Sequence, residues 1–107
     1  SLDQTKIRQA LFNLLRNAQE SIQHTHGKIL FSASAVPDGI QITISDNGCG
    51  MTEDQIENAF RPFVTYKPGG TGLGLAVTRQ IIEAHQGTLC VESTPKEGTS
   101  FYIFLPG

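Results

Sequence analysis

The stretch IQITISDNGCGM, residues 40–51, combines a strand pattern with a charged residue at a position where core is expected. Ile40, Ile42 and Ile44 alternate with polar residues, which predicts a half-buried β-strand whose isoleucine face points inward. Asp46 is the next residue in that phase. Because a buried carboxylate without a partner costs several kcal/mol, Asp46 marks a candidate binding site at the end of this strand.

The first half of the chain predicts one helix followed by a hairpin. Residues 3–24 carry apolar side chains spaced by three or four, as on one face of an amphipathic helix: Ile7, Leu11, Leu14, Ala18 and Ile22. Residues 28–36 and 40–46 are strand-like and flank Pro37-Asp38-Gly39, a turn sequence. These two strands are therefore expected to pair as a β-hairpin.

The second half predicts two more helices and two more strands. Thr52 and Gln55 form a capping box, which predicts a short helix over 53–59. The glycine- and proline-rich residues 61–72 predict a loop. A second amphipathic helix is marked by Leu75, Thr78, Ile82 and His85, with Gly87 as its expected C-terminal cap.

The last two predicted strands, 87–94 and 99–106, flank the turn at 95–98. The order helix, two strands, two helices, two strands is neither a strict βαβ alternation nor all-α. It predicts an α/β (α+β) two-layer sandwich with helices on one face of a largely antiparallel sheet.

Composition narrows the function classes. The 107 residues suit one domain. Eight Lys and Arg against ten Asp and Glu give a net charge of −2 with no basic run, which disfavours nucleic-acid binding. No apolar run approaches the about 20 residues of a membrane span and the N-terminus resembles no signal peptide, so we expect a cytoplasmic segment without membrane contact. Cys49 and Cys90 are expected to be free thiols.

Further polar residues accompany Asp46. Thr99 is in phase with the apolar residues of the last strand, so it too is expected to point inward and could hydrogen-bond a carboxylate. Asn13 and Asn17 lie one turn apart on the first predicted helix. The pair either is solvated or makes ordinary hydrogen bonds, or it belongs to a functional site. A glycine loop with Gly72-Leu73-Gly74 leads into a helix N-terminus, a place that suits phosphate.

Four segments in this order resemble the N, G1, F and G2 boxes of the ATP-binding catalytic domain of sensor histidine kinases: LFNLLRNA, DNGCGM, AFRPF and GGTGLGLAV. That domain shares a superfamily with DNA gyrase, heat-shock chaperones and mismatch-repair ATPases. The resemblance covers nearly the whole chain and implies a Bergerat-type fold, with three helices on one face of a mixed, mostly antiparallel sheet. The sequence of residues 62–77 most resembles that of the nitrogen-regulation type of sensor kinase.

The resemblance implies an adenine site. Asp46 would accept a hydrogen bond from the exocyclic amine of the base, with Thr99 holding the carboxylate or a bridging water. Gly48 and Gly50 would let the backbone approach the base. GTP would be rejected, because guanine presents a carbonyl at that edge. The alternative from the residues themselves is that Asp46 ends its strand in an Asx-turn with Asn47.

The resemblance also implies a triphosphate site with Mg²⁺. Asn17 would be the metal ligand, and Asn13 would line the site without acting as a base. Gly70, Thr71, Gly72, Leu73 and Gly74 would bind phosphates through backbone amides, with Lys67 as a mobile cation or as a plain solvated lysine. The aromatics of the F box, Phe60 and Phe63, are explained equally well by core packing.

Two departures from the family pattern matter. Glu20 occupies a position where many sensor kinases have lysine, so Arg16 or Lys67 would carry more of the charge neutralisation. The chain also starts at the N-box helix, without a leading strand, dimerisation helices or an acceptor histidine, so residues 1–107 are expected to be a slightly truncated catalytic domain.

The function implied is transfer of the γ-phosphoryl group of Mg-ATP to a histidine on a separate dimerisation domain, with a response regulator downstream. The isolated domain is expected to be monomeric. Because Asn13 stands where hydrolysing relatives have a glutamate base, hydrolysis should be poor. The alternatives are a stand-alone ATPase of the same superfamily and a nucleotide-binding regulatory module without phosphotransfer.

Overall fold

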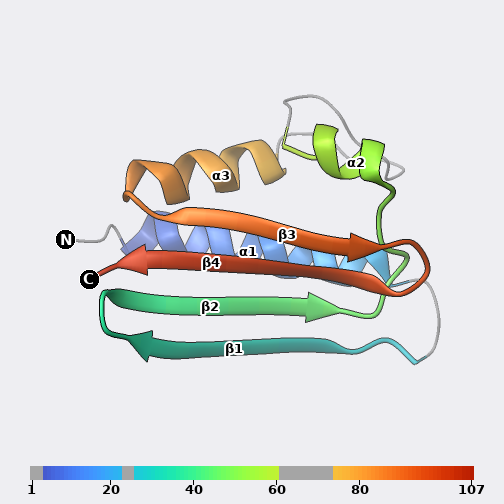
Figure 1. Cartoon of the computed structure of the whole chain (residues 1–107), viewed down its shortest axis with the longest axis horizontal. Helices are drawn as coiled ribbons and strands as arrows, with labels where there is room; N and C mark the ends of the chain where they lie inside the picture. The colour runs from blue at the N-terminus through green and yellow to red at the C-terminus, as the bar shows by residue number, and fades with distance from the viewer. Residues whose placement is uncertain (1–3, 23–25, 61–73) are drawn as a thin grey trace.

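The computed structural model describes residues 4–22, 26–60 and 74–107 and shows two layers, a sheet and the helices packed on it (Figure 1). The elements in chain order are α1 (Gln4–Ser21), β1 (Ile29–Val36), β2 (Gly39–Asp46), α2 (Glu53–Asn58), α3 (Gly74–Ala84), β3 (Thr88–Thr94) and β4 (Gly98–Pro106). The predicted sandwich, the hairpin and the predicted helices and strands are confirmed, whereas the predicted loop over 61–72 lies outside the described residues. None of the helices in this part of the chain is long and apolar enough to cross a membrane.

The sheet has the strand order β1-β2-β4-β3. Every pairing among the described strands is antiparallel, so this part of the sheet is antiparallel rather than mixed. In the central pair Ile44 faces Phe101 and Asp46 faces Thr99. The end of α1, the end of β2 and the β3–β4 turn lie at the same end of the molecule (Figure 1).

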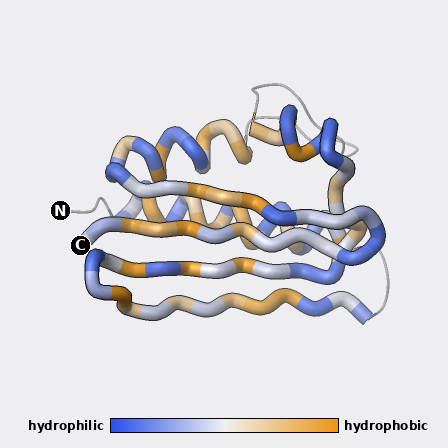
Figure 2. Tube along the Cα trace, viewed as in Figure 1, coloured by the Kyte–Doolittle hydropathy of each residue, from blue (hydrophilic) through white to orange (hydrophobic). Residues whose placement is uncertain are grey.

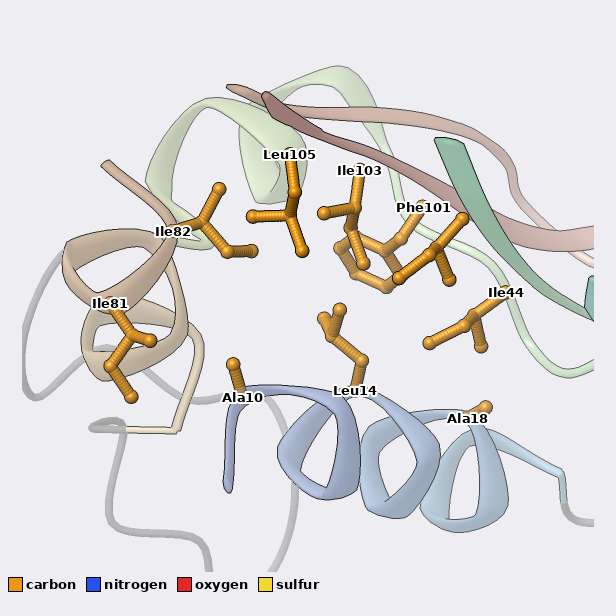
Figure 3. Close-up of a cluster of buried hydrophobic side chains, with 10 residues drawn as sticks. Ala10, Leu14, Ala18, Ile44, Ile81, Ile82, Phe101, Ile103 and Leu105 are labelled. Atoms are coloured by element: carbon orange, nitrogen blue, oxygen red, sulfur yellow. The ribbon is translucent and has the colours of Figure 1, made fainter. Parts of the chain in front are cut away.

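The core lies between α1, α3 and one face of β2 and β4 (Figure 3). Leu14 and Ala18 from the predicted stripe are fully buried, whereas Ile7 and Leu11 pack on the margin of the core. Apolar and polar residues alternate along the strands, and Figure 2 shows this as alternating colours. The buried residues that make up this core cluster are Ala10, Leu14, Ala18, Ile42, Ile44, Ile81, Ile82, Phe101, Ile103 and Leu105.

The inward isoleucine face of β2 is confirmed only in part. Ile42 and Ile44 are buried, but Ile40 is 40% exposed. Ile40 pairs with Leu105 at the start of β2, away from the end of the sheet that carries Asp46. The edge strand β1 is exposed along nearly its whole length, so it contributes little to the core.

The capping box of α2 is confirmed. The Thr52 side chain accepts a hydrogen bond from the Gln55 backbone N–H at 3.2 Å, and the Gln55 side chain accepts from Thr52 N–H at 2.9 Å. Beyond α2, the Phe60 ring packs edge-on against Phe101, with ring centroids 6.4 Å apart. Core packing therefore accounts for Phe60.

α3 ends differently from the prediction that placed its cap at Gly87. The left-handed residue is Gln86, with φ of 62°. Gln86 N–H donates to Glu83 O at 3.0 Å and Gly87 N–H to Ile82 O at 2.9 Å, which together form a Schellman motif. Gly87 is required for another reason, because a Cβ there would meet the carbonyl oxygen of Phe104 on β4.

Replacing Gln86 by glycine should therefore stabilise the fold. A side chain in the left-handed region is strained, and glycine removes that strain, so we expect the free energy of unfolding to rise by about 0.5–1 kcal/mol. Urea denaturation measures this as a higher midpoint at unchanged slope. Gln80→Gly, on the exposed interior of the same helix, is the control and should lower stability by about 1 kcal/mol.

Candidate functional site

Three polar residues from three strands form a row on the inner face of the sheet at one end. Asp46 of β2 pairs in register with Thr99 of β4, and Thr99 pairs with Ser93 of β3. Thr99 is 4% exposed, so the prediction that it points inward is confirmed. Ser93 was missed, although it is in phase with Leu89 and Val91 on β3 just as Asp46 is in phase with Ile44.

The Asp46 carboxylate is half-buried and held through one of its two oxygens. Oδ1 accepts a hydrogen bond from Gly48 N–H at 2.8 Å and another from the Ser21 hydroxyl at 3.1 Å. The Gly48 contact is an Asx-turn, the alternative expected from the residues alone. Within residues 4–22, 26–60 and 74–107 no donor reaches Oδ2, so this oxygen remains available to a ligand.

Thr99 does not hold Asp46 directly, contrary to one form of the prediction. Its hydroxyl lies 2.7 Å from the Ser93 hydroxyl, which also accepts a hydrogen bond from Met51 N–H at 2.8 Å. The hydroxyl that donates to Asp46 is instead that of Ser21 at the end of α1. Although Thr99 pairs with Asp46 in register, its hydroxyl meets that of Ser93 on β3, and Ser21 comes from the helix that packs on β2.

The loop after Asp46 is braced by the chain that precedes β1. The Asn47 side chain accepts from Lys28 N–H at 2.7 Å and donates to His26 O at 2.9 Å. Asn47 N–H also donates to Lys28 O at 3.3 Å. Further along the loop, Cys49 O accepts from Lys96 N–H at 2.7 Å. The loop is thus fixed from two sides before any ligand binds.

Gly48 and Gly50 are both required by packing within the protein. A Cβ at Gly48 would meet the Ser21 side-chain oxygen and lie 2.6 Å from the Ser21 carbonyl oxygen. Gly50 has φ of 68°, and a Cβ there would meet the carbonyl oxygen of Thr94. These contacts explain both glycines without a ligand, so an approach of the backbone to a base remains a prediction for them.

Asn13, Arg16 and Asn17 lie along α1, as predicted. Asn13 and Asn17 are half-buried and Arg16 is exposed. An open groove of about 830 Å³ runs along α1 and brings Asn13 and Arg16 together with Phe12. Asn17 lies four residues before Ser21, so it stands one helical turn from the residue that holds Asp46.

The part of the chain that the structure describes contains no group of three or more His, Cys, Asp or Glu side chains that could hold a metal ion. A single amide oxygen from Asn17 fits Mg²⁺, which usually keeps few protein ligands and completes its shell with phosphates and water.

Some predicted residues lie outside the described ranges: Phe63, Lys67, Gly70, Thr71, Gly72 and Leu73. Gly74 is the first residue of α3, as expected for a glycine loop that leads into a helix. Cys49 and Cys90 are both exposed and form no disulfide, which confirms the prediction of free thiols.

Comparisons with known proteins agree with this architecture. The sequence model of the histidine kinase-, DNA gyrase B- and HSP90-like ATPase family matches residues 2–107. Sporulation kinase B of Bacillus subtilis is 44% identical over 104 residues, which are 97% of this chain and 24% of that protein. The sensor histidine kinase ZraS of Escherichia coli K12 is 41% identical over 104 residues, 97% of this chain and 22% of that protein.

Solved structures show the same fold. The catalytic domain of histidine kinase ThkA superposes with a TM-score of 0.85 at 35% identity, over 98% of this chain and 68% of that one. The mycobacterial sensor histidine kinase MprB gives a TM-score of 0.87 at 27% identity, over 98% of this chain and 74% of that one.

The names of the relatives indicate the class of kinase to which this chain is similar. They are sensor histidine kinases and sporulation kinases, and the nitrogen-regulation subtype suggested by residues 62–77 finds no support among them. The chain spans about a quarter of the length of the curated relatives quoted above.

Proposed function

Because this chain belongs to the histidine kinase-, DNA gyrase B- and HSP90-like ATPase family, we propose that it is the catalytic domain of a sensor histidine kinase. In this proposal it binds Mg-ATP and donates the γ-phosphoryl group to a histidine on a separate dimerisation domain of the parent protein. A response regulator would receive the phosphoryl group from that histidine. The proposal places the domain in the cytoplasm, where ATP is available.

The observation that carries the proposal is the state of the Asp46 carboxylate. Oδ1 is held by Gly48 and Ser21, while Oδ2 has no donor among the described residues. A half-buried carboxylate oxygen in this state suits a ligand that donates a hydrogen bond, such as the exocyclic amine of adenine. Thr99 lies next to Asp46 in the sheet and carries a hydroxyl, which is 2.7 Å from the Ser93 hydroxyl.

The phosphate end of the site would lie along α1 and the glycine loop. Asn17 would provide an oxygen to Mg²⁺, and the ion, when bound, would neutralise charge on the phosphates. Arg16, which is exposed beside the groove on α1, would contribute positive charge there. Lys67, Gly70, Thr71, Gly72, Leu73 and Gly74 complete the proposed phosphate contacts.

Asn13 favours phosphotransfer over hydrolysis. Its side-chain amide cannot accept a proton from water at neutral pH, so the site lacks a general base at the position where hydrolysing relatives have glutamate. The proposed contribution of this chain is therefore to position the nucleotide and to neutralise charge.

Calorimetric titration with ATP, ADP and GTP, each with and without Mg²⁺, tests the nucleotide site. We expect both adenine nucleotides to bind, Mg²⁺ to strengthen ATP binding, and GTP to bind at least 100-fold more weakly. Equal binding of GTP, or no binding of any nucleotide, would contradict the proposal.

The same chain, mixed with radiolabelled ATP and a dimerisation domain from a related kinase, tests the chemistry. Label should appear on the histidine of the added domain while phosphate release without it stays near background. Rapid release of phosphate by the chain alone would instead indicate an ATPase. Tight ATP binding without label on any supplied dimerisation domain would indicate a regulatory module.

A further inference from the structure

Ser21 is a buried polar residue that the proposed chemistry does not use. It is the last residue of α1 and is 7% exposed. Its hydroxyl oxygen lies 2.8 Å from Ala18 O and 3.1 Å from Asp46 Oδ1. A hydroxyl has one hydrogen, so both acceptors share it or compete for it. The contact with Ala18 alone would satisfy the hydroxyl within its own helix.

The contact with Asp46 has a geometric consequence. Ser21 and Gly48 N–H both approach Oδ1, and they come from different elements, the end of α1 and the loop after β2. Two donors on one oxygen restrict rotation of the carboxylate about its last side-chain bond. The other oxygen, Oδ2, is consequently kept in one direction, away from both donors.

The backbone around Ser21 is equally fixed. Cys49 N–H donates to Ser21 O at 2.9 Å, which joins the end of α1 to the loop. The close approach of Gly48 leaves no space for even one added carbon atom between the loop and Ser21. The loop after β2 therefore packs directly against Ser21, and the backbone hydrogen bond from Cys49 holds the two together.

We infer that Ser21 is a positioning residue for base recognition: its hydroxyl orients the Asp46 carboxylate so that Oδ2 faces the amine of adenine. The inference rests on the proposed function of Asp46 and adds a determinant of nucleotide specificity to it. Ser21 also lies one helical turn from Asn17, so a shift of α1 at the proposed metal ligand would also move the hydroxyl that holds the Asp46 carboxylate.

Nucleotide selectivity tests the inference, because inosine triphosphate differs from ATP in carrying a carbonyl in place of the exocyclic amine. For Ser21→Ala we expect ATP affinity to fall 3- to 10-fold, the range of one hydrogen bond. Affinity for inosine triphosphate should change less than 2-fold. Isothermal calorimetry with both nucleotides gives the ratio directly.

A double-mutant cycle identifies the residue through which Ser21 acts. In an Asp46→Ala background there is no carboxylate to orient, so Ser21→Ala should cause no further loss of ATP affinity. Equal losses for ATP and inosine triphosphate would overturn the inference, as would the same loss of ATP affinity in both backgrounds. Either result would assign Ser21 to the packing of α1 alone.

Ser45→Ala is the matched control. Ser45 lies next to Asp46 in β2, and its hydroxyl is 2.8 Å from that of Ser100 on the opposite face of the sheet. This variant loses a part-buried hydroxyl contact of the same kind, yet it should leave the ratio of ATP to inosine triphosphate affinity unchanged. A changed ratio here would mean that the ratio reports general loosening of the sheet, and the inference would fall.

The wild-type chain separates the two levels of the argument. If it prefers ATP over inosine triphosphate and Asp46→Ala removes the preference, the proposed role of Asp46 holds. An unchanged ratio in Ser21→Ala then refutes the inference alone. If the wild type shows no preference, the proposed role of Asp46 fails and the inference fails with it.

Discussion

Asp46→Asn should lower ATP affinity about 100-fold, which corresponds to about 2.7 kcal/mol, and leave the fold intact. The retained Oδ1 can still accept from Gly48 and Ser21, and asparagine forms the same Asx-turn. The second oxygen, however, is replaced by an NH₂ group that donates. Two donors, this group and the adenine amine, would then face one another, so a favourable contact becomes an unfavourable one.

The same substitution should favour inosine triphosphate, whose carbonyl can accept from the new NH₂ group. Calorimetry with both nucleotides should therefore show a reversed preference, while thermal unfolding without nucleotide stays within a few degrees of the wild type. Asp38→Asn, on the exposed turn between β1 and β2, makes the same change in net charge and should leave both affinities unaltered. Unaltered ATP affinity in Asp46→Asn, with or without a change in stability, would mean that Asp46 serves only the turn.

The location of the candidate site could be predicted because it follows from the alternation of inward and outward residues along one strand. Asp46 continues the pattern of Ile42 and Ile44, and in the structure those two residues are buried while Asp46 ends the strand on the same face. Thr99 follows from the same reasoning on β4. Strand periodicity is a local property, so it can be read without knowing which strands are neighbours.

The partners of these residues could not be predicted in the same way. Ser21 reaches Asp46 across 25 residues of chain, and Ser93 reaches Met51 across 42. Which hydroxyl meets which acceptor depends on the register of three strands and on where α1 ends. The apolar stripe predicted for α1 continued to Ile22, whereas the buried face ends at Ser21. The sequence offered one sign of this end, since Ser21 lies three residues after Ala18 and so shares its helix face.

Glycines show a second limit on reading function from sequence. Gly48 and Gly50 match a nucleotide-binding motif by resemblance, yet their closest neighbours are Ser21 and Thr94 of the protein itself. Gly87 fits a helix cap by position, but the left-handed residue is Gln86. Close contacts between backbone segments that are far apart in the sequence affect neither the spacing nor the composition of residues. The structural reason for a glycine at a given position is therefore evident only in the fold.

Gly50→Ala should lower the free energy of unfolding by about 3 kcal/mol. Gly50 has φ of 68°, where a Cβ is strained, and that Cβ would also meet the carbonyl oxygen of Thr94, which is backbone and cannot rotate away. The loop would have to separate from the end of β3, which would weaken the contact of Met51 N–H with Ser93. Urea denaturation without nucleotide measures the loss.

Gly107→Ala provides the comparison, because the nearest atom to an added carbon there is Gly39 Cα at 3.4 Å, an ordinary van der Waals contact, and the site is exposed. It should change stability by less than about 0.5 kcal/mol. A Gly50→Ala chain that is as stable as the wild type but has lost ATP binding would contradict the packing argument. It would show that the nucleotide, rather than Thr94, requires a glycine at this position, as the family resemblance implied. Lost stability, with ATP binding retained in the folded fraction, would instead assign Gly50 to the construction of the loop.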